Sequence, residues 1–194
     1  LNIHAKSRIL ILGESGSGKS TLLRLISGIT EATAGSIYVN NTSITSLNLN
    51  HYRAQLGLSL TEETPFEGSI KDNLTFGNAN ITDEEVFDVL IKIGLMDFVK
   101  EQPKGLQTVL YPDGKQMSHT VSKKIILARA ILKKPKVLIL EDALDRFNPT
   151  ETNAIINYLS HKDRPWALIV VSSSSSWKSK CTEIIQLEKG EIKI

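Results

Sequence analysis

The sequence has a single cysteine, no long apolar run and no excess of one charge, and each absence excludes a class of protein. Cys181 has no second cysteine to pair with, so an internal disulfide is impossible and a reducing compartment is expected. We interpret its thiol as a small packed side chain. No stretch approaches the roughly 20 apolar residues that a membrane-spanning helix needs, and residues 1–6 do not resemble a signal peptide. A membrane anchor would therefore have to come from another segment.

The charge balance and the composition narrow the class further. The 23 lysine and arginine side chains are nearly balanced by 21 aspartates and glutamates, so the net charge is only +2 and no nucleic-acid partner is expected. Hydrophobic residues make up 41% of the chain and charged residues 23%, which argues against a disordered or fibrous protein. A length of 194 residues fits one α/β domain with subdivisions.

A glycine-rich segment follows the first apolar run. Residues 8–12 read Arg-Ile-Leu-Ile-Leu and predict a buried parallel strand, and apolar residues at helical spacing begin at Leu22. Between them, residues 13–20 match the pattern G-x-x-x-x-G-K-[ST] at every fixed position. A strand, a glycine loop and a helix in this order form a cradle for phosphate groups, whereas a simple linker would not need every fixed residue.

Each residue type in this segment has a physical role in holding the phosphates of ATP. Glycines let backbone N–H groups converge on phosphate oxygens, the helix N-terminus adds partial positive charge, and Lys19 adds a full one. The Ser20 hydroxyl suits Mg²⁺, which prefers oxygen ligands. The predicted cofactors are therefore ATP and Mg²⁺. The residues predicted to bind the nucleotide are Gly13, Ser15, Gly16, Ser17, Gly18, Lys19, Ser20 and Thr21.

Two carboxylates follow a second apolar strand. Residues 137–140 read Val-Leu-Ile-Leu and lead into Glu141 and Asp142. One acid at the end of such a strand can bind Mg²⁺, and the other can lie near an attacking water. We therefore predict Glu141 as a metal ligand together with Ser20, and Asp142 and Lys19 as catalytic residues. Alone, the pair could equally be two solvated acids at a strand end.

Other elements are predicted from local signals. A turn at Asn40-Asn41 predicts a small hairpin, and Thr82 with Glu85 predicts a capping box at the start of a helix. Asn148 followed by Pro149 predicts the start of another helix. Further predicted elements are a helix around 125–132, strands at 167–171 and 184–187, and a last strand at 192–194 that closes a hairpin.

Together these motifs resemble the nucleotide-binding domain of ABC transporters. The stretch 136–143 resembles the family's second motif, and residues 66–74, Phe-Glu-Gly-Ser-Ile-Lys-Asp-Asn-Leu, are similar to a stretch of its exporter branch. Residues 128–130, Pro135 and the ending 187–192 also stand where the family has them. The resemblance covers the whole chain. It implies an ABC ATPase-like α/β fold with a P-loop core of mixed, mainly parallel sheet and flanking helices, a helical subdomain and a small antiparallel β element.

The same resemblance implies how the chain is divided. One nucleotide-binding domain, 1–194, is expected, with a P-loop core at about 1–60 and 127–194 and a helical subdomain at about 62–126. The aromatic residue that stacks on adenine in the family lies upstream of this sequence. We therefore expect a fragment that lacks its N-terminal strand and its membrane domain.

Several family motifs are altered in this sequence. The acid pair at 141–142 reads Glu-Asp where the family has Asp-Glu, and residues 117–121 read Met-Ser-His-Thr-Val where the family has the signature Leu-Ser-Gly-Gly-Gln. Thr61 stands at the position of a glutamine that touches Mg²⁺, and Ser173 at that of a histidine that contacts the γ-phosphate. Residues 145–148 end in asparagine where the family has aspartate.

These departures affect hydrolysis more than binding. Asp142 is one methylene shorter than the family's general base, and His119 and Thr120 add side chains where glycines let a helix approach the partner's γ-phosphate. The resemblance therefore implies an exporter domain that binds MgATP and couples nucleotide state to a membrane domain, with weak or absent hydrolysis. Whether the chain acts as an ATPase is left open. We interpret His119 itself as a surface side chain.

Partners and location also follow from the resemblance. The expected partners are a transmembrane domain, in the same or an associated chain, and a second nucleotide-binding domain in a head-to-tail dimer. Both a homodimer and a heterodimer are open, with the heterodimer slightly preferred. The domain is then expected at the cytoplasmic face of the membrane. Two other functions remain open, a non-catalytic nucleotide-gated module and a soluble non-transport ABC ATPase, and the segment 66–74 argues against the second.

Five lysines surround the helix predicted around 125–132. They are Lys123, Lys124, Lys133, Lys134 and Lys136. Because they flank an amphipathic helix and its exit, we interpret them as a solvated face and not as a surface for a polyanion.

Overall fold

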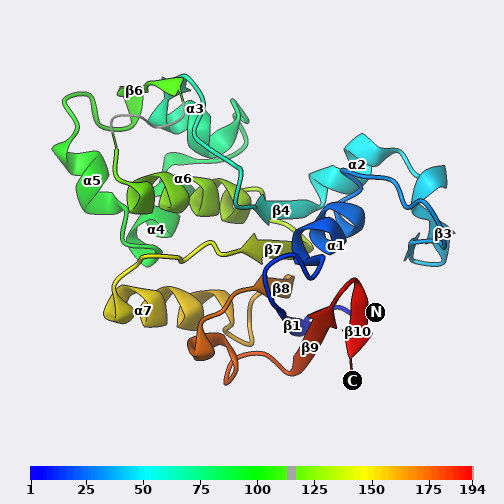
Figure 1. Ribbon diagram of the computed structural model, residues 1–194. Helices are drawn as coiled ribbons and strands as arrows, with labels where there is room; N and C mark the ends of the chain where they lie inside the picture. The colour runs from blue at the N-terminus through cyan, green and yellow to red at the C-terminus, as the bar shows by residue number, and fades with distance from the viewer. Residues whose placement is uncertain (113–116, 194) are drawn as a thin grey trace.

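A six-stranded sheet forms the centre of the computed structural model, which describes residues 1–112 and 117–193 (Figure 1). The strand order is β10-β9-β1-β8-β7-β4, and all neighbours are parallel except β10, which pairs antiparallel with β9. This mixed, mainly parallel sheet with flanking helices confirms the predicted fold class. The strands are β1 (Arg8–Leu12), β4 (Leu56–Ser59), β7 (Val137–Glu141), β8 (Ala167–Val171), β9 (Glu183–Glu188) and β10 (Glu191–Lys193).

The central strands are apolar on both faces because both faces are covered. Ile9 and Ile11 of β1 pack in one cluster with Leu23 of the first helix, whereas Leu10 packs in a larger cluster with the helices of the other face. Successive side chains of a strand point to opposite faces, so a strand buried on both sides requires a continuous apolar run. The predicted strands at 8–12, 137–140 and 167–171 are confirmed.

Seven α-helices are found in the described ranges. Figure 1 shows α3, α4, α5 and α6 gathered on one side of the sheet, with α7 beneath them and α1 and α2 at the other end. Helix α6 packs against β4 and against α3 and α4, so it joins this helical group to the sheet. The helices are α1 (Lys19–Ile26), α2 (Leu49–Ala54), α3 (Ile70–Thr75), α4 (Asp83–Lys92), α5 (Met96–Glu101), α6 (His119–Leu132) and α7 (Pro149–Leu159).

Side chains cap the starts of the helices at the positions that the sequence indicates. Thr82 and Glu85 form the predicted capping box of α4. Asn148 accepts a hydrogen bond from the backbone N–H of Glu151 at the start of α7, and Pro149 occupies its first position. Both predictions are confirmed. Helix α6 begins at His119, six residues before the apolar stripe from which it was predicted.

Short elements complete the fold. Asn40 and Asn41 both have positive φ in the turn between β2 (Tyr38–Val39) and β3 (Thr42–Ser43), so the predicted hairpin is confirmed. The final hairpin β9–β10 is also confirmed, although residue 194 of its predicted last strand lies outside the described residues. The remaining elements are β5 (Gly68–Ser69), which pairs with β6 (Val109–Leu110), and the 3₁₀ turns η1 (Ile44–Ser46), η2 (Gly105–Gln107) and η4 (Ser175–Trp177).

Two of the five lysines near α6 are buried, which corrects the prediction of a solvated face for them. Lys123 and Lys124 are each only 6% exposed. Their amines reach the interior because backbone carbonyls solvate them there: Lys124 Nζ lies 2.8 Å from the carbonyl oxygen of Gly94 and forms an ion pair with Glu151. The prediction holds for Lys133, Lys134 and Lys136, which are exposed.

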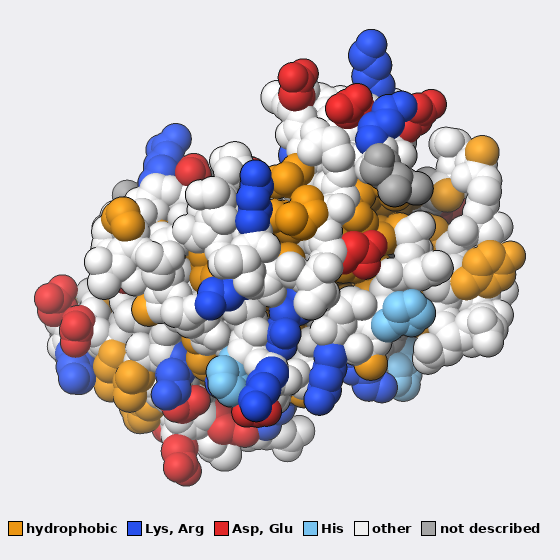
Figure 2. Space-filling view, turned by 90° about the horizontal axis from the view of Figure 1, so that it is seen from below, with side chains coloured by type: hydrophobic (Ala, Val, Ile, Leu, Met, Phe, Trp, Pro, Cys, Tyr) orange, Lys and Arg blue, Asp and Glu red, His pale blue; other side chains and the backbone are white. Residues whose placement is uncertain are grey.

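Three further observations concern the surface charges, the single thiol and the apolarity of the helices. Figure 2 shows lysine and arginine side chains scattered over one face, with acidic side chains beside them. Cys181 is half-buried and packs against the larger apolar cluster, and burial raises the pKa of its thiol to about 11. This thiol is the packed side chain that the sequence predicted. Within the described ranges, no helix combines the length and the apolarity needed to cross a membrane.

Candidate functional site

One cavity of about 870 Å³ lies where the parallel strands end. The carboxyl ends of β1, β7 and β8 meet at the same edge of the sheet, and this edge is where ligands bind in open α/β folds. The cavity brings together almost all of the predicted site residues from segments far apart in the sequence. Those that line it are Gly13, Ser15, Gly16, Gly18, Lys19, Ser20, Thr21, Glu141 and Asp142.

Ser17 is the one predicted nucleotide-binding residue that does not line the cavity. Its side chain is 6% exposed, and its hydroxyl lies 3.5 Å from the amine of Lys19. Its carbonyl oxygen accepts a hydrogen bond from the backbone N–H of Gly190. Ser17 therefore faces the interior of the loop.

The glycines give the loop its shape. Gly16 and Gly18 have φ of +79° and +100°, a left-handed conformation that side chains disfavour. At Gly13 the reason is space, because an added Cβ would collide with the carbonyl oxygen of Leu187 in β9. The loop thus presents its backbone to the cavity directly before α1, whose N-terminal end carries partial positive charge.

Lys19 places a full positive charge inside this loop. Its Nζ donates hydrogen bonds to the carbonyl oxygens of Gly13 at 2.8 Å and Glu14 at 2.7 Å. These bonds hold the amine across the loop at the wall of the cavity. An anion in the cavity would meet the amine and the exposed backbone N–H groups together.

Glu141 and Ser20 offer oxygen ligands on the wall of the same cavity. The Glu141 side chain is only 4% exposed, and its Oε2 accepts a hydrogen bond from the backbone N–H of Thr61 at 3.2 Å. A carboxylate and a hydroxyl fit Mg²⁺, which binds few protein oxygens and keeps phosphate and water oxygens as its other ligands. Among the described residues, no group of three or more His, Cys, Asp or Glu side chains is arranged so that it could hold a metal ion by itself.

Asp142 has an unusual backbone conformation. Its φ is +45°, and its N–H donates to the carbonyl oxygen of Val171 at 2.9 Å, which fixes the residue at the end of β7. Partial desolvation, and then the charges of Glu141 and Asp145, raise the pKa of its carboxyl group. This carboxyl group therefore holds a proton more tightly than an ordinary aspartate does.

The altered motif positions fall into two groups. Thr61 and Ser173 line the cavity, where the resemblance placed them. The described residues that line it include none from 117–121. There, Ser118 caps α6 by accepting a hydrogen bond from the N–H of Val121 at 3.3 Å, and His119 is exposed as predicted.

A second hollow, of about 290 Å³, adjoins the cavity and shares Asp142 and Ser173 with it. Asp145, Arg146 and Phe147 line this second hollow. The structure therefore places most of the segment 145–148 beside the main cavity.

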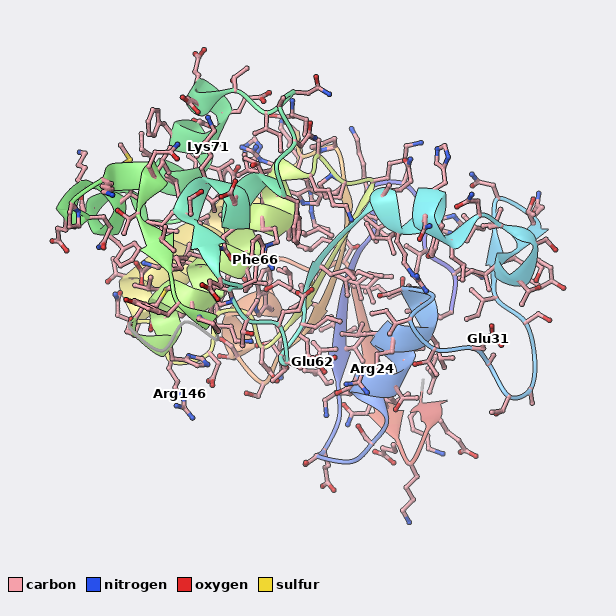
Figure 3. The ribbon with its side chains drawn as sticks, turned by 90° about the horizontal axis from the view of Figure 1, so that it is seen from above. Arg24, Glu31, Glu62, Phe66, Lys71 and Arg146 are labelled. Atoms are coloured by element: carbon pink, nitrogen blue, oxygen red, sulfur yellow. The ribbon has the colours of Figure 1, made fainter. Side chains whose placement is uncertain are left out.

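One ion pair of the cavity wall was not found from the sequence. Arg24 of α1 and Glu62 form an ion pair at 2.9 Å, and Figure 3 shows the two side chains side by side. The two residues lie 38 positions apart and belong to no motif, so nothing local in the sequence connects them. Lys123 was also missed, because lysines on a helix usually indicate a solvated face.

The fold combines a mainly parallel sheet, a phosphate-binding loop after its strand β1, and a second strand, β7, that leads into two carboxylates at the cavity. Together with the family match, these features define the class as an ABC-type P-loop ATPase fold. The chain belongs to the ABC transporter family, whose model matches residues 1–145.

Several known proteins are similar to the chain. It is 34% identical to the ATP-dependent permease MDL1 of Candida albicans over 198 residues, which cover 99% of the chain and 29% of the permease. It is 34% identical to the alpha-factor-transporting ATPase of Saccharomyces cerevisiae, over 94% of the chain and 14% of that protein. A bacterial Atm1-family ABC exporter solved with ATP bound shares the fold with a TM-score of 0.91 and 23% identity, over 99% of the chain and 34% of the exporter. The chain thus spans about a third or less of the length of each of these three proteins.

Proposed function

We propose that this chain is the ATP-binding domain of an ABC exporter, which binds MgATP and couples its nucleotide state to a membrane domain, with weak or absent hydrolysis. The observation that carries the proposal is the complete phosphate cradle, in which Lys19 and the glycine loop face one cavity with Glu141. The names of the relatives support it, since they are a permease and a transporting ATPase.

The residues divide the work of binding. Backbone N–H groups of residues 13–21 hold phosphate oxygens, and the amine of Lys19 turns from its carbonyl partners toward them. Ser20 and Glu141 hold Mg²⁺, which when bound neutralises charge on the phosphates. Glu141 keeps its orientation because the N–H of Thr61 fixes one of its oxygens.

Hydrolysis is weak in this proposal because the residues that act on the transition state are altered. Asp142 serves as the base with a side chain one methylene shorter than that of glutamate, and a serine hydroxyl at Ser173 cannot replace an imidazole. A poorly positioned base alone lowers the rate by about 10² to 10⁴-fold. Ground-state binding depends mainly on the phosphate loop and is retained.

The partners follow from the same proposal. A transmembrane domain, in the same or an associated chain, receives the nucleotide signal at the cytoplasmic face of the membrane. A second nucleotide-binding domain pairs head to tail with this one, as a homodimer or a heterodimer. The side chains of His119 and Thr120 at the start of α6 then lie where that partner's γ-phosphate approaches, so they loosen the closed dimer.

We also propose that the chain is one domain of a longer polypeptide, with a P-loop core at about 1–60 and 127–194 and a helical subdomain at about 62–126. The support is that all six strands of the main sheet come from the first and last parts, and that α3, α4 and α5 come from the middle. Residues 113–116 of that middle part lie outside the described residues.

The test is a calorimetric titration of the chain with ATP and Mg²⁺, together with an assay of phosphate release. Lys19→Ala is expected to weaken binding by about 10- to 100-fold, since it removes a charge-assisted bond to phosphate. Lys180→Ala changes an exposed lysine outside the cavity and serves as the control. Absence of binding by the unaltered chain would refute the proposal.

The rate of phosphate release distinguishes a weakly hydrolysing exporter domain from the two other functions, a non-catalytic nucleotide-gated module and a soluble, non-transport ABC ATPase. Slow release that is abolished by Asp142→Asn supports a weak ATPase. Binding with no release above that of Lys19→Ala supports the non-catalytic nucleotide-gated module instead. Brisk release by the isolated chain would contradict weak hydrolysis and would favour a soluble, non-transport ABC ATPase.

A further inference from the structure

The four residues 60–63, here called the junction segment, connect β4 to the helical group and contact three other elements. The N–H of Thr61 donates to Glu141 of β7 at 3.2 Å, and Glu62 pairs with Arg24 of α1. The amine of Lys123 in α6 reaches the same segment from the side of the helical group. The metal-binding end of β7 and α6 thus meet at one short piece of backbone.

Lys123 holds that backbone directly. Its Nζ donates to the carbonyl oxygen of Thr61 at 2.9 Å and to that of Leu60 at 3.3 Å. The side chain is 6% exposed, so these carbonyls replace the water that the amine would otherwise bind. Burial lowers the pKa of Lys123, and the nearby carboxylates of Glu63 and Glu141 oppose that change.

Thr61 depends on this support because its own side chain is short. Its hydroxyl lies 3.5 Å from the backbone oxygen of Glu141, at the limit of a hydrogen bond, whereas its N–H makes the bond to the carboxylate. The orientation of the Glu141 carboxylate therefore depends on where the Thr61 backbone lies. Lys123 fixes that position through the carbonyl of the same residue.

We propose that Lys123 is a positioning residue for the metal-binding carboxylate: it holds the Thr61 backbone, which orients Glu141, and so couples α6 to the Mg²⁺-dependent part of nucleotide binding. The inference rests on the proposed function. The positioning role of Lys123 differs from a general structural role, because a lysine that only stabilised the fold would affect nucleotide binding equally with and without Mg²⁺.

The experiment measures the affinity of the chain for ATP in Mg²⁺ and again in EDTA. The quantity compared between the variants and the unaltered chain is the ratio of the affinity in Mg²⁺ to the affinity in EDTA. Lys123→Met is expected to lower this ratio about tenfold, since hydrogen bonds from a charged donor are lost. Lys123→Arg keeps a cationic donor and is expected to restore most of the ratio. Lys133→Met is the matched control, because its amine also bonds a backbone carbonyl, that of Arg53 at 2.7 Å, at the other end of α6.

Each outcome supports or overturns the proposal. An unchanged ratio in folded Lys123→Met would overturn it, and so would a higher ratio, which would make Lys123 a counter-charge to Glu141. An equal fall in Lys133→Met would also overturn it. If Lys123→Met does not fold, Lys123→Gln is measured with the same expectations. Failure of the unaltered chain to bind MgATP refutes the proposed function, whereas normal binding with an unchanged ratio in the variant refutes only the role of Lys123.

Discussion

The backbone N–H of Gly190 donates a hydrogen bond to the carbonyl oxygen of Ser17, with an N···O distance of 2.9 Å. Gly190 lies in the turn between β9 and β10 at φ +84°, and Ser17 lies in the middle of the phosphate loop. The two segments also approach closely at Gly18, where an added Cβ would lie 3.6 Å from the Cα of Gly190. The last hairpin of the sheet therefore supports the loop that lines the cavity.

This contact predicts that Gly190→Ala weakens nucleotide binding. An added Cβ meets no atom within 4 Å, so the effect comes from the left-handed φ and not from a collision. Alanine in this left-handed conformation is less stable than glycine by about 1 kcal/mol. The turn relieves part of this strain by changing its backbone angles, and this change moves the N–H of residue 190 away from the carbonyl oxygen of Ser17. We expect the free energy of unfolding to fall by about 1 kcal/mol, measured in urea, and the affinity for MgATP to fall about threefold, measured by calorimetry.

Gly77→Ala is the matched control for this prediction. Gly77 has φ +71° and equally open space, but it follows α3 and does not line the cavity. Its variant is expected to lose the same stability and to bind MgATP normally. Equal losses of affinity in both variants would mean that the hairpin has no particular effect on the phosphate loop.

The buried pair Lys124–Glu151 predicts a large loss of stability when one partner is removed. The side chains are 8% and 22% exposed, and the lysine also donates to the carbonyl of Gly94. Lys124→Met leaves a mostly buried carboxylate without its counter-charge, which costs several kcal/mol when burial is complete. Because Glu151 retains some exposure, we expect a fall of about 2 kcal/mol in the free energy of unfolding, measured in urea.

The double variant Lys124→Met with Glu151→Leu separates the pair from the packing. Replacing both charges with apolar side chains removes the unpaired carboxylate, so we expect most of the lost stability to return. The comparison also needs the single variant Glu151→Leu. If the loss of unfolding free energy in the double variant equals the sum of the losses in the two single variants, the two side chains do not stabilise each other in the folded chain.

Sequence reasoning succeeded where the signal is local. Residues 9–12 of β1 and 137–140 of β7 are apolar at every position, and Thr82 with Glu85 lies within one helical turn, so their structures follow from neighbouring residues. The loop at 13–20 is similarly contiguous, and its residues meet the carboxylates because parallel strands end at one edge.

The contacts of Lys123 and Gly190 could not be predicted in this way. Lys123 bonds carbonyls 62 and 63 positions away, and the partner of Gly190 lies at the other end of the chain. All three acceptors are backbone oxygens, which every residue carries, so side-chain identity gives no sign of the pairing. A lysine on an amphipathic helix reads as solvated unless the fold brings a carbonyl to its amine.

Asp142 predicts how the stability of the metal-free chain depends on pH. Its pKa lies above its ordinary value of 3.8, so the folded chain holds the proton more tightly than the unfolded chain does. That contribution to stability is present below the ordinary pKa and is lost as the pH rises through the raised one. Asp142→Asn cannot ionise and tolerates the left-handed φ, so relative to the unaltered chain it should gain less than about 1 kcal/mol toward neutral pH, measured in urea with EDTA. A relative gain that shrinks toward neutral pH would instead mean that Lys19 stabilises the charged form.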